Sequence, residues 1–370
     1  MEPLLRAIHS QSLAIYLQVH EYLKAIWKLT VLNEGTKTEQ EDEQWEQRII
    51  LVQNIKQLPR RITESIGSFK EADRPGKIDM LGKAGLLFPA LASTFIIVLI
   101  LTFLWYEAIP ILTNPIGGPG IIVSPTWDPN RNLYGIAIFI VGSLYCTGIA
   151  IGIAVPLGVG GAIFLSEFCP MQLRQPIRMI IEMMAAIPSI VYGLWAYIVL
   201  VPWISNSIAP AVGFDTNGLS LLAGGLILAI MLLPTVVTIS NDALVTVPRS
   251  LREASLALGA TQSETARKVV LSAALPGIGA AIVLSLGRAV GETMAVLMVT
   301  GNSLQIPYTL FDPTYVMTSI ITNQLGYAFV FPLWRSALFA VGLILLLISI
   351  MFTVTAKLFI RWGMKTRGLA

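Results

Sequence analysis

Long apolar stretches separated by short polar segments dominate the chain after residue 83. A helix needs about 20 apolar residues to cross a bilayer, and six stretches reach that length. The second stretch is too long for one straight crossing, so we expect Pro156 to kink it or to end its membrane part. Pro188 and Pro234 fall inside the third and fourth, where neighbouring groups can satisfy the freed carbonyls. The six predicted spans are Ala84–Ile109, Tyr134–Ser166, Ile177–Ile204, Leu219–Ser240, Leu275–Val299 and Leu333–Ile360.

The first 83 residues have a different pattern, with apolar residues at helical spacing between many polar ones. Pro3–Leu32 and Trp45–Phe69 both show this spacing, and the polar segment Asn33–Asp42 joins them. We therefore expect an all-α polytopic membrane protein with two parts: an N-terminal helical hairpin in residues 1–83 and a six-span domain in residues 84–370. The pattern leaves open whether the hairpin binds a partner, rests on lipid or covers the membrane domain.

The distribution of charge supports this division and excludes several classes of protein. Residues 1–83 carry 12 basic and 12 acidic side chains, whereas the remaining 287 residues carry only 23 charged groups. A soluble domain has about 25% charged residues, so a soluble enzyme is excluded. The net charge of +3, without a Lys/Arg-rich run, argues against nucleic-acid binding. The two cysteines and two histidines show no disulfide, metal-ligand or nucleophile spacing, so we expect no metal or cofactor bound to this chain.

Lysine and arginine positions predict the orientation in the membrane. The N-terminal 83 residues, the turn with Arg174 and Arg178, the loop 241–274 and the C-terminal tail hold 22 of the 25 basic residues, while the alternate loops hold Arg131 alone. Basic residues concentrate on the cytoplasmic side of membrane proteins. We therefore expect a multi-pass protein of the cytoplasmic membrane with both termini in the cytoplasm.

The predicted cytoplasmic loop 241–274 contains a specific pattern. Leu251–Ala257 favours a short helix, Gly259 permits a sharp break, and Thr261 can begin a second helix with Glu264 as its capping-box partner. Two short helices of this kind form either a projecting surface on which a soluble partner docks or an amphipathic loop that covers the membrane face. The candidate coupling residues are Glu253, Ala254, Ser255, Gly259 and Ala260.

This pattern, Glu-Ala-Ser-x3-Gly-Ala, resembles the EAA coupling loop of bacterial ABC importer permeases, which docks onto the ATP-hydrolysing subunit. Many members have Leu-Pro directly after the Val-Val pair, whereas this chain has Leu271-Ser272 there and Leu-Pro only at Leu275-Pro276. The departure concerns the end of the coupling helix rather than the motif itself.

A second motif narrows the resemblance. The segment Leu286–Asn302 contains Gly-Glu-Thr-Met-Ala and resembles the fifth-span signature of one permease subunit of the phosphate-specific ABC importer. The similarity extends from about Leu86 to the C-terminus and includes Phe164-Leu-Ser-Glu167 and Ile187-Pro-Ser-Ile190. It implies a second related permease subunit, a dimer of ATPase subunits that bind ATP and magnesium, an extracytoplasmic phosphate-binding protein, and contact with phosphate and membrane lipid.

Arg288 and Glu292 lie deep in the predicted fifth span, four residues apart, and we expect them on one helical face. A charged residue in the bilayer is costly and marks a functional site by default. The simpler explanation is an ion pair that neutralises the helix for insertion. The functional hypothesis is an anion site, because a guanidinium matches phosphate oxygens and stays charged. We expect Glu292 to hold Arg288 in place, with the hydroxyls of Ser285 and Thr293 lining the path.

Other hypotheses remain open at this stage. Arg178 and Glu182 are one helical turn apart and are expected to form a local ion pair. An intramembrane arginine does not separate phosphate from another oxyanion such as sulfate or molybdate. A membrane enzyme is disfavoured because the spans contain no histidine and no paired carboxylates, and a self-contained channel has no use for a coupling loop. The chain has no G-x4-G-K-[ST] sequence, so ATP hydrolysis would require a partner.

Overall fold

The structure, a computed structural model, describes residues 74–113 and 118–366. The hairpin predicted between Pro3 and Phe69 lies outside the described residues. The described chain divides into two compact units within the helix Arg74–Thr113, between Phe95 and Ile96, and each unit is considered by itself. The division predicted between residues 83 and 84 falls inside the same helix, and it stays a prediction.

Helices make up almost all of the described chain, with two short strands at one end. The α-helices are α3 (Arg74–Thr113), α4 (Ala137–Ile163), α5 (Met171–Ala185), α6 (Ser189–Trp195), α7 (Val201–Trp203), α8 (Ala209–Ala211), α9 (Leu221–Val245), α10 (Arg249–Ala257), α11 (Gln262–Glu264), α12 (Leu271–Gly291), α13 (Met294–Val299), α14 (Met317–Ala328) and α15 (Pro332–Thr366). The 3-10 turns are η1 (Pro119–Ile122) and η2 (Pro129–Arg131), and the π-helical turns are η3 (Phe164–Phe168), η4 (Ala196–Leu200), η5 (Ile204–Ile208) and η6 (Thr265–Val270). The strands β1 (Trp127–Asp128) and β2 (Leu133–Tyr134) pair antiparallel.

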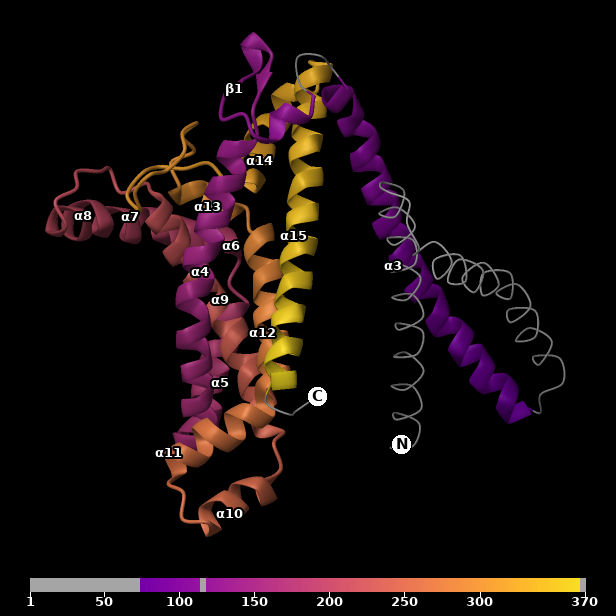
Figure 1. The fold of residues 1–370 in the computed structure, drawn as a ribbon, viewed down its shortest axis with the longest axis vertical. Helices are drawn as coiled ribbons and strands as arrows, with labels where there is room; N and C mark the ends of the chain where they lie inside the picture. The colour runs from indigo at the N-terminus through magenta and orange to yellow at the C-terminus, as the bar shows by residue number, and fades with distance from the viewer. Residues whose placement is uncertain (1–73, 114–117, 367–370) are drawn as a thin grey trace, which may run out of the picture. The chain divides into compact units, whose positions relative to one another are not determined.

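Six helical segments among the described residues are long and apolar enough to cross a membrane, which confirms the predicted number of spans. Within the second unit, α4, α9, α12 and α15 run side by side, and α10 and α11 cap one end of the bundle (Figure 1). The C-terminal end of α15 lies at the same end, whereas β1 and α14 lie at the opposite end (Figure 1). The six segments are Gly85–Thr113, Ala137–Phe168, Ser189–Ala211, Leu221–Val245, Gln262–Gly291 and Pro332–Leu358.

Small residues allow the central helices to approach closely, and α9 is the most buried of the six spans. A Cβ atom added to Gly225 on α9 would lie 2.5 Å from the Ile149 side chain on α4, and one added to Gly158 on α4 would lie 2.6 Å from Val236 on α9. Close backbone approach through small residues is the usual basis of helix packing in lipid, where apolar burial does not drive association. These contacts fix α4 against α9, and the two helices together support the functional segments.

The end of the bundle with the strands is held by aromatic and polar contacts. Trp127 on β1 pairs with Tyr134 on β2, and its ring packs edge-on against the rings of Tyr134 and Phe139. The side-chain oxygen of Gln324 on α14 accepts hydrogen bonds from the indole nitrogens of Trp127 at 3.0 Å and Trp334 at 3.1 Å. The two buried or half-buried indoles therefore have partners for their polar atoms, as aromatic residues near a membrane surface require.

Pro156 and Pro188 have different effects on their helices. Pro156 lies within α4, which continues through it to Ile163, so it does not end the helix. Pro188 does interrupt the predicted span Ile177–Ile204, because α5 ends at Ala185 and α6 begins at Ser189 after it. Proline lacks an N–H group and restricts the preceding residue, and both effects favour a break at this point. The predicted third span Ile177–Ile204 therefore contains a break, and the segment long and apolar enough to cross the membrane is Ser189–Ala211.

Candidate functional site

Arg288 lies in the last turn of α12, one turn from the end of the helix at Gly291. Its guanidinium group is exposed, and Nη1 donates to the hydroxyl oxygen of Thr235 on α9 at a long distance of 3.5 Å. Thr235 lies next to Pro234 within the helix, and no motif in the sequence marks it. An arginine whose side chain is exposed in the membrane part of a protein can present its donors to an anion.

Glu292 does not share a helical face with Arg288. It has an extended conformation, with ψ at 131°, because α12 ends one residue earlier and α13 begins only at Met294. Its carboxylate accepts from the backbone N–H of Ala295 at 3.4 Å, and its backbone carbonyl accepts from the hydroxyl of Thr318 at 2.9 Å. No Arg288–Glu292 ion pair occurs among the described residues. The prediction of a shared helical face was wrong, because Glu292 serves the first turn of a new helix.

The two predicted hydroxyls occupy different surroundings. Ser285 is fully buried one turn before Arg288 on α12, and its hydroxyl has no hydrogen-bond partner within the described part of the chain. Thr293 is half-buried in the break between α12 and α13, where its hydroxyl donates to the carbonyl of Gly291 at 3.3 Å. Both residues are within a few positions of the helix end, but the hydroxyl that contacts Arg288 belongs to Thr235.

A second helix break lies beside the first. The hydroxyl of Tyr192 on α6 donates to the carbonyl of Met184 on α5 at 2.8 Å, which closes the gap created around Pro188. The breaks are held together because α6 packs on α13, where a Cβ atom on Gly193 would lie 2.9 Å from the Cα of Ala295. Interrupted helices that meet inside a membrane bundle are typical of transporter substrate sites.

The loop after α9 forms the two short helices that its sequence predicts. The α10 helix ends at Ala257, Gly259 has a positive φ of 85°, and Thr261 and Glu264 form a reciprocal capping box at the start of α11. The φ value explains the glycine, since a side chain at that conformation is strained. The observed capping box confirms the sequence-based expectation.

The candidate coupling residues lie along this loop. Glu253, Ala254 and Gly259 are exposed, and Ala260 is half-buried with its N–H donating to the carbonyl of Ser255 at 3.2 Å. The hydroxyl of Ser255 also shares a hydrogen bond of 2.9 Å with the hydroxyl of Thr265 on η6. Ser255 and Ala260 therefore stabilise the loop, whereas the Glu253 side chain remains accessible.

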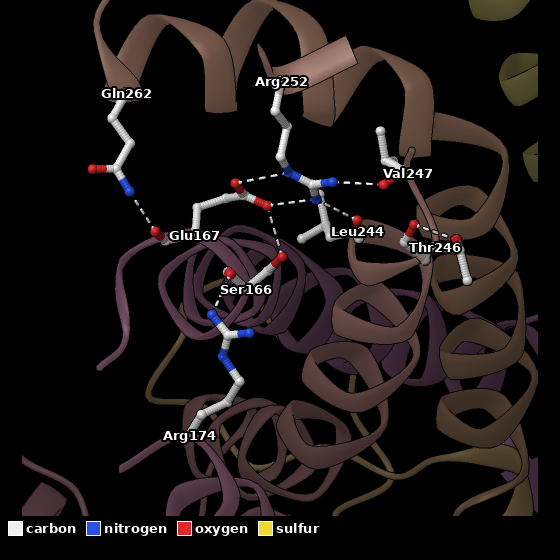
Figure 2. A network of polar contacts seen from close by, with 9 residues as sticks. Ser166, Glu167, Arg174, Leu244, Thr246, Val247, Arg252 and Gln262 are labelled. Atoms are coloured by element: carbon white, nitrogen blue, oxygen red, sulfur yellow. Dashed lines mark hydrogen bonds and ion pairs between the residues drawn. The ribbon is translucent and has the colours of Figure 1, made fainter. Parts of the chain in front are cut away.

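Arg252, directly before Glu253, connects this loop to the membrane helices. Its Nε and Nη2 atoms donate to the two carboxylate oxygens of Glu167 on η3, at 3.2 Å and 2.9 Å (Figure 2). Its guanidinium also donates to the backbone carbonyls of Leu244 and Val247 at the end of α9. Glu167 was noted only as part of a family motif and Arg252 was not singled out, since residues 85 positions apart give no local signal of a pair.

The carbonyl groups at the end of η3 are bonded to side chains from two other elements. The carbonyl of Ser166 accepts from Arg174 on α5 at 2.7 Å, and the carbonyl of Glu167 accepts from the amide of Gln262 on α11 at 2.6 Å (Figure 2). The predicted local pair of Arg178 and Glu182 is confirmed at 2.7 Å. Arg178 additionally reaches Asp242 on α9 at 2.9 Å, so α5 is joined to α9 as well.

Comparison with known proteins identifies the family. Residues 154–362 match the family described as binding-protein-dependent transport system inner membrane component. The chain belongs to this family. It is therefore a multi-pass permease subunit of the inner membrane, and such subunits do not catalyse the hydrolysis of ATP themselves.

Individual relatives carry more specific names. The phosphate transport system permease protein PstC of Haemophilus influenzae is 38% identical over 265 residues, covering 68% of this chain and 84% of the relative. A probable PstC of Methanocaldococcus jannaschii is 34% identical over 291 residues, covering 74% and 91%. The probable ABC transporter permease protein YqgH of Bacillus subtilis is 39% identical, covering 66% of this chain and 79% of the relative.

A solved structure supports the fold. The structure of a bacterial alginate ABC transporter, in complex with its alginate pentasaccharide-bound periplasmic protein, superimposes with a TM-score of 0.53 at 16% identity. The superposition covers 78% of this chain and 96% of the other chain. At this level of identity, the similarity establishes the ABC permease fold alone.

Proposed function

We propose that this permease moves inorganic phosphate across the cytoplasmic membrane as part of an ATP-driven importer that works by alternating access. The observation that carries the proposal is the position of Arg288, which lies in the last turn of α12 before the break at Glu292 and contacts Thr235 on α9. The names of the relatives support phosphate as the transported anion. A bundle with broken helices can bind an ion at the break and alternate between two openings.

In the proposed mechanism, the guanidinium of Arg288 binds two phosphate oxygens through its parallel N–H donors. The hydroxyl of Thr235 accepts from Arg288 and can donate its own proton to the phosphate, whereas the Tyr192 hydroxyl uses its proton on the carbonyl of Met184 and holds the break between α5 and α6 together. Thr293 lines the path at the helix break, and the carboxylate of Glu292 repels the anion so that it is not trapped. Monohydrogen phosphate carries an O–H group that can donate a hydrogen bond to the Glu292 carboxylate. Sulfate has no such proton at neutral pH.

The proposed assembly contains a second related permease, a dimer of ATPase subunits and an extracytoplasmic phosphate-binding protein. ATP and magnesium bind to the ATPase subunits, which dock on the exposed residues around Glu253 of α10. The proposed orientation has α10 and both termini in the cytoplasm. It is supported by the common location of α10 and the C-terminal end of α15 at one end of the bundle (Figure 1).

Uptake of radiolabelled phosphate into proteoliposomes that contain the complete complex tests this function. We expect ATP-dependent uptake that excess unlabelled phosphate abolishes and excess sulfate leaves unchanged. Arg288→Gln should abolish uptake, whereas Arg131→Gln, which removes an exposed arginine at the opposite end, should not. Competition by sulfate at similar concentrations would favour a general oxyanion permease, and unchanged uptake by the Arg288 variant would disprove the proposed site.

A further inference from the structure

The short helix α10 has no buried residue, although it carries the motif that the proposed function assigns to the ATPase contact. Apolar packing therefore holds it only weakly against the rest of the molecule. Besides the chain connections at its two ends, polar contacts join α10 to the membrane helices. Ser255 bonds to Thr265 on η6, which leads into α12. Arg252 connects α10 to η3, the turn that follows α4, and to α9.

The Arg252 guanidinium is placed at the ends of two spans at once. Its guanidinium donates to the carbonyl of Leu244 in the last turn of α9 and to that of Val247 just after the helix, and so adds to the backbone bonds that close this end. The positive charge also suits the negative end of the helix dipole. Its two bonds to Glu167 fix it to the π-helical turn that ends the second span. One planar side chain thus joins three segments.

The Glu167 carboxylate is a rigid partner for this contact. Its side chain is only 9% exposed and that of Arg252 only 20%, so solvent screens the pair little. The hydroxyl of Ser166 donates to the same carboxylate at 2.8 Å, and the backbone carbonyl of Glu167 accepts from Gln262. By contrast, the nearby pair of Lys268 and Glu264 is exposed, at 75% and 47%, and lies on consecutive turns of one segment.

We propose that Arg252 is a positioning residue that makes α10 move with the cytoplasmic ends of α4 and α9 as one body, and so couples ATP hydrolysis to the opening of the bundle. The inference rests on the proposed function, because it assumes that an ATPase acts on α10. A lysine does not replace this residue, since a single ammonium group lacks the planar fork that reaches the carboxylate and the carbonyls together.

The first test measures phosphate transported per ATP hydrolysed in proteoliposomes that contain the complete complex. We expect Arg252→Gln, Arg252→Lys and Glu167→Gln each to lower this ratio about tenfold, which is within the usual range for coupling between distant sites. Lys268→Gln, which breaks the exposed pair, should keep the wild-type ratio. The conservative Arg252→Lys variant keeps the charge and guards against a loss of folding. A wild-type ratio in these variants would overturn the inference.

A second test does not depend on the transported anion. Spin labels at Ser250 on α10 and Leu157 on α4, in a complex whose Cys146 and Cys169 are replaced by alanine, report the separation of the two helices. We expect ATP to leave this distance unchanged in the otherwise wild-type complex and to shift or broaden it in Arg252→Lys. Equal ATP-dependent shifts in both would overturn the inference. If the wild-type complex transports no phosphate, the proposed function is disproved. The coupling role of Arg252 is still decided by the distance between the two spin labels, because that measurement does not depend on the transported anion.

Discussion

Arg252 and Glu167 lie 85 residues apart and form a two-point ion pair at the end of the membrane bundle. The pair connects two segments. One is the loop with α10 and α11, whose shape follows from its local sequence, and the other is the π-helical turn η3 at the end of the second span. Because each partner also bonds to backbone groups or hydroxyls around it, the contact fixes an orientation as well as a distance. This contact is the basis of the first prediction.

Glu167→Gln should destabilise the permease more than Lys268→Gln. Removing one partner of a largely buried pair leaves an uncompensated charge, which costs about 3 kcal/mol, whereas an exposed pair contributes about 0.5 kcal/mol. Thermal unfolding of the purified permease in detergent measures both. The opposite order would contradict the importance assigned to burial, and a double-mutant cycle with Arg252 separates the pair from its other bonds.

Thr235→Val should weaken phosphate uptake without loss of the assembled complex. The substitution keeps the shape of the side chain but removes the hydroxyl that the proposed site uses as a donor to phosphate, and a hydrogen bond to a charged group is worth about 1.5–3 kcal/mol. We therefore expect the half-saturating phosphate concentration to rise about tenfold in an uptake assay. Thr238→Val, three residues further along α9, is the control. Equal effects of the two variants would disprove a specific role for Thr235.

Gly259→Ala should disturb the angle between α10 and α11. The glycine has a φ of 85°, and a residue with a side chain pays about 1–2 kcal/mol in this conformation. Gly213 has a φ of 80° in an exposed loop before α9, so Gly213→Ala would introduce the same strain and provides the control. Co-purification of the ATPase subunit should fall for Gly259→Ala and stay constant for Gly213→Ala. A similar fall in both would indicate a general loss of stability.

Gly225→Val should weaken the packing of α9 on α4. The new side chain would collide with Ile149, and overpacking of this kind costs about 1–3 kcal/mol. Gly148 on α4 has no neighbouring atom within 4 Å of an added Cβ within the described residues, so Gly148→Val should be tolerated far better. The melting temperature of the purified permease distinguishes the two. Equal melting temperatures would show that α4 and α9 are further apart than observed.

Asp312 should make the segment before α14 sensitive to acid. Partial burial acts to raise its pKa, but hydrogen bonds from Thr309 and Tyr308 hold the pKa below its ordinary value. Because the pKa of the folded state is below the ordinary value of about 4, the ionised carboxylate stabilises the segment at a pH above that value. This stability is lost as the pH falls through the folded pKa. Hydrogen exchange at the amides of Tyr308 and Thr309, corrected for intrinsic rates, should therefore lose protection only in acid.

The Asp312→Asn variant is the control for this pH dependence. Its amide oxygen still accepts hydrogen bonds but carries no titratable proton, so protection at the two amides should be weaker and independent of pH between about 3 and 7. A pH dependence that persists in the variant would assign the titration to another group.

The sequence by itself determined the features that depend on neighbours along the chain. Six apolar stretches of sufficient length predicted the number of spans, because a bilayer requires every backbone group to be paired within a helix. The capping box of Thr261 with Glu264 and the turn at Gly259 also followed from residues a few positions apart. Local hydrogen bonding and backbone sterics decide such features.

Only the tertiary structure decided where the helices break and what meets at the breaks. Glu292 lies four residues after Arg288, which suits one helical face, yet the bonds of Glu292 to Ala295 and Thr318 stabilise a new helix start instead. Thr235, Tyr192 and Arg252 acquired their roles from partners on other helices. Such contacts depend on how distant helices pack, and helical periodicity contains no information about that packing.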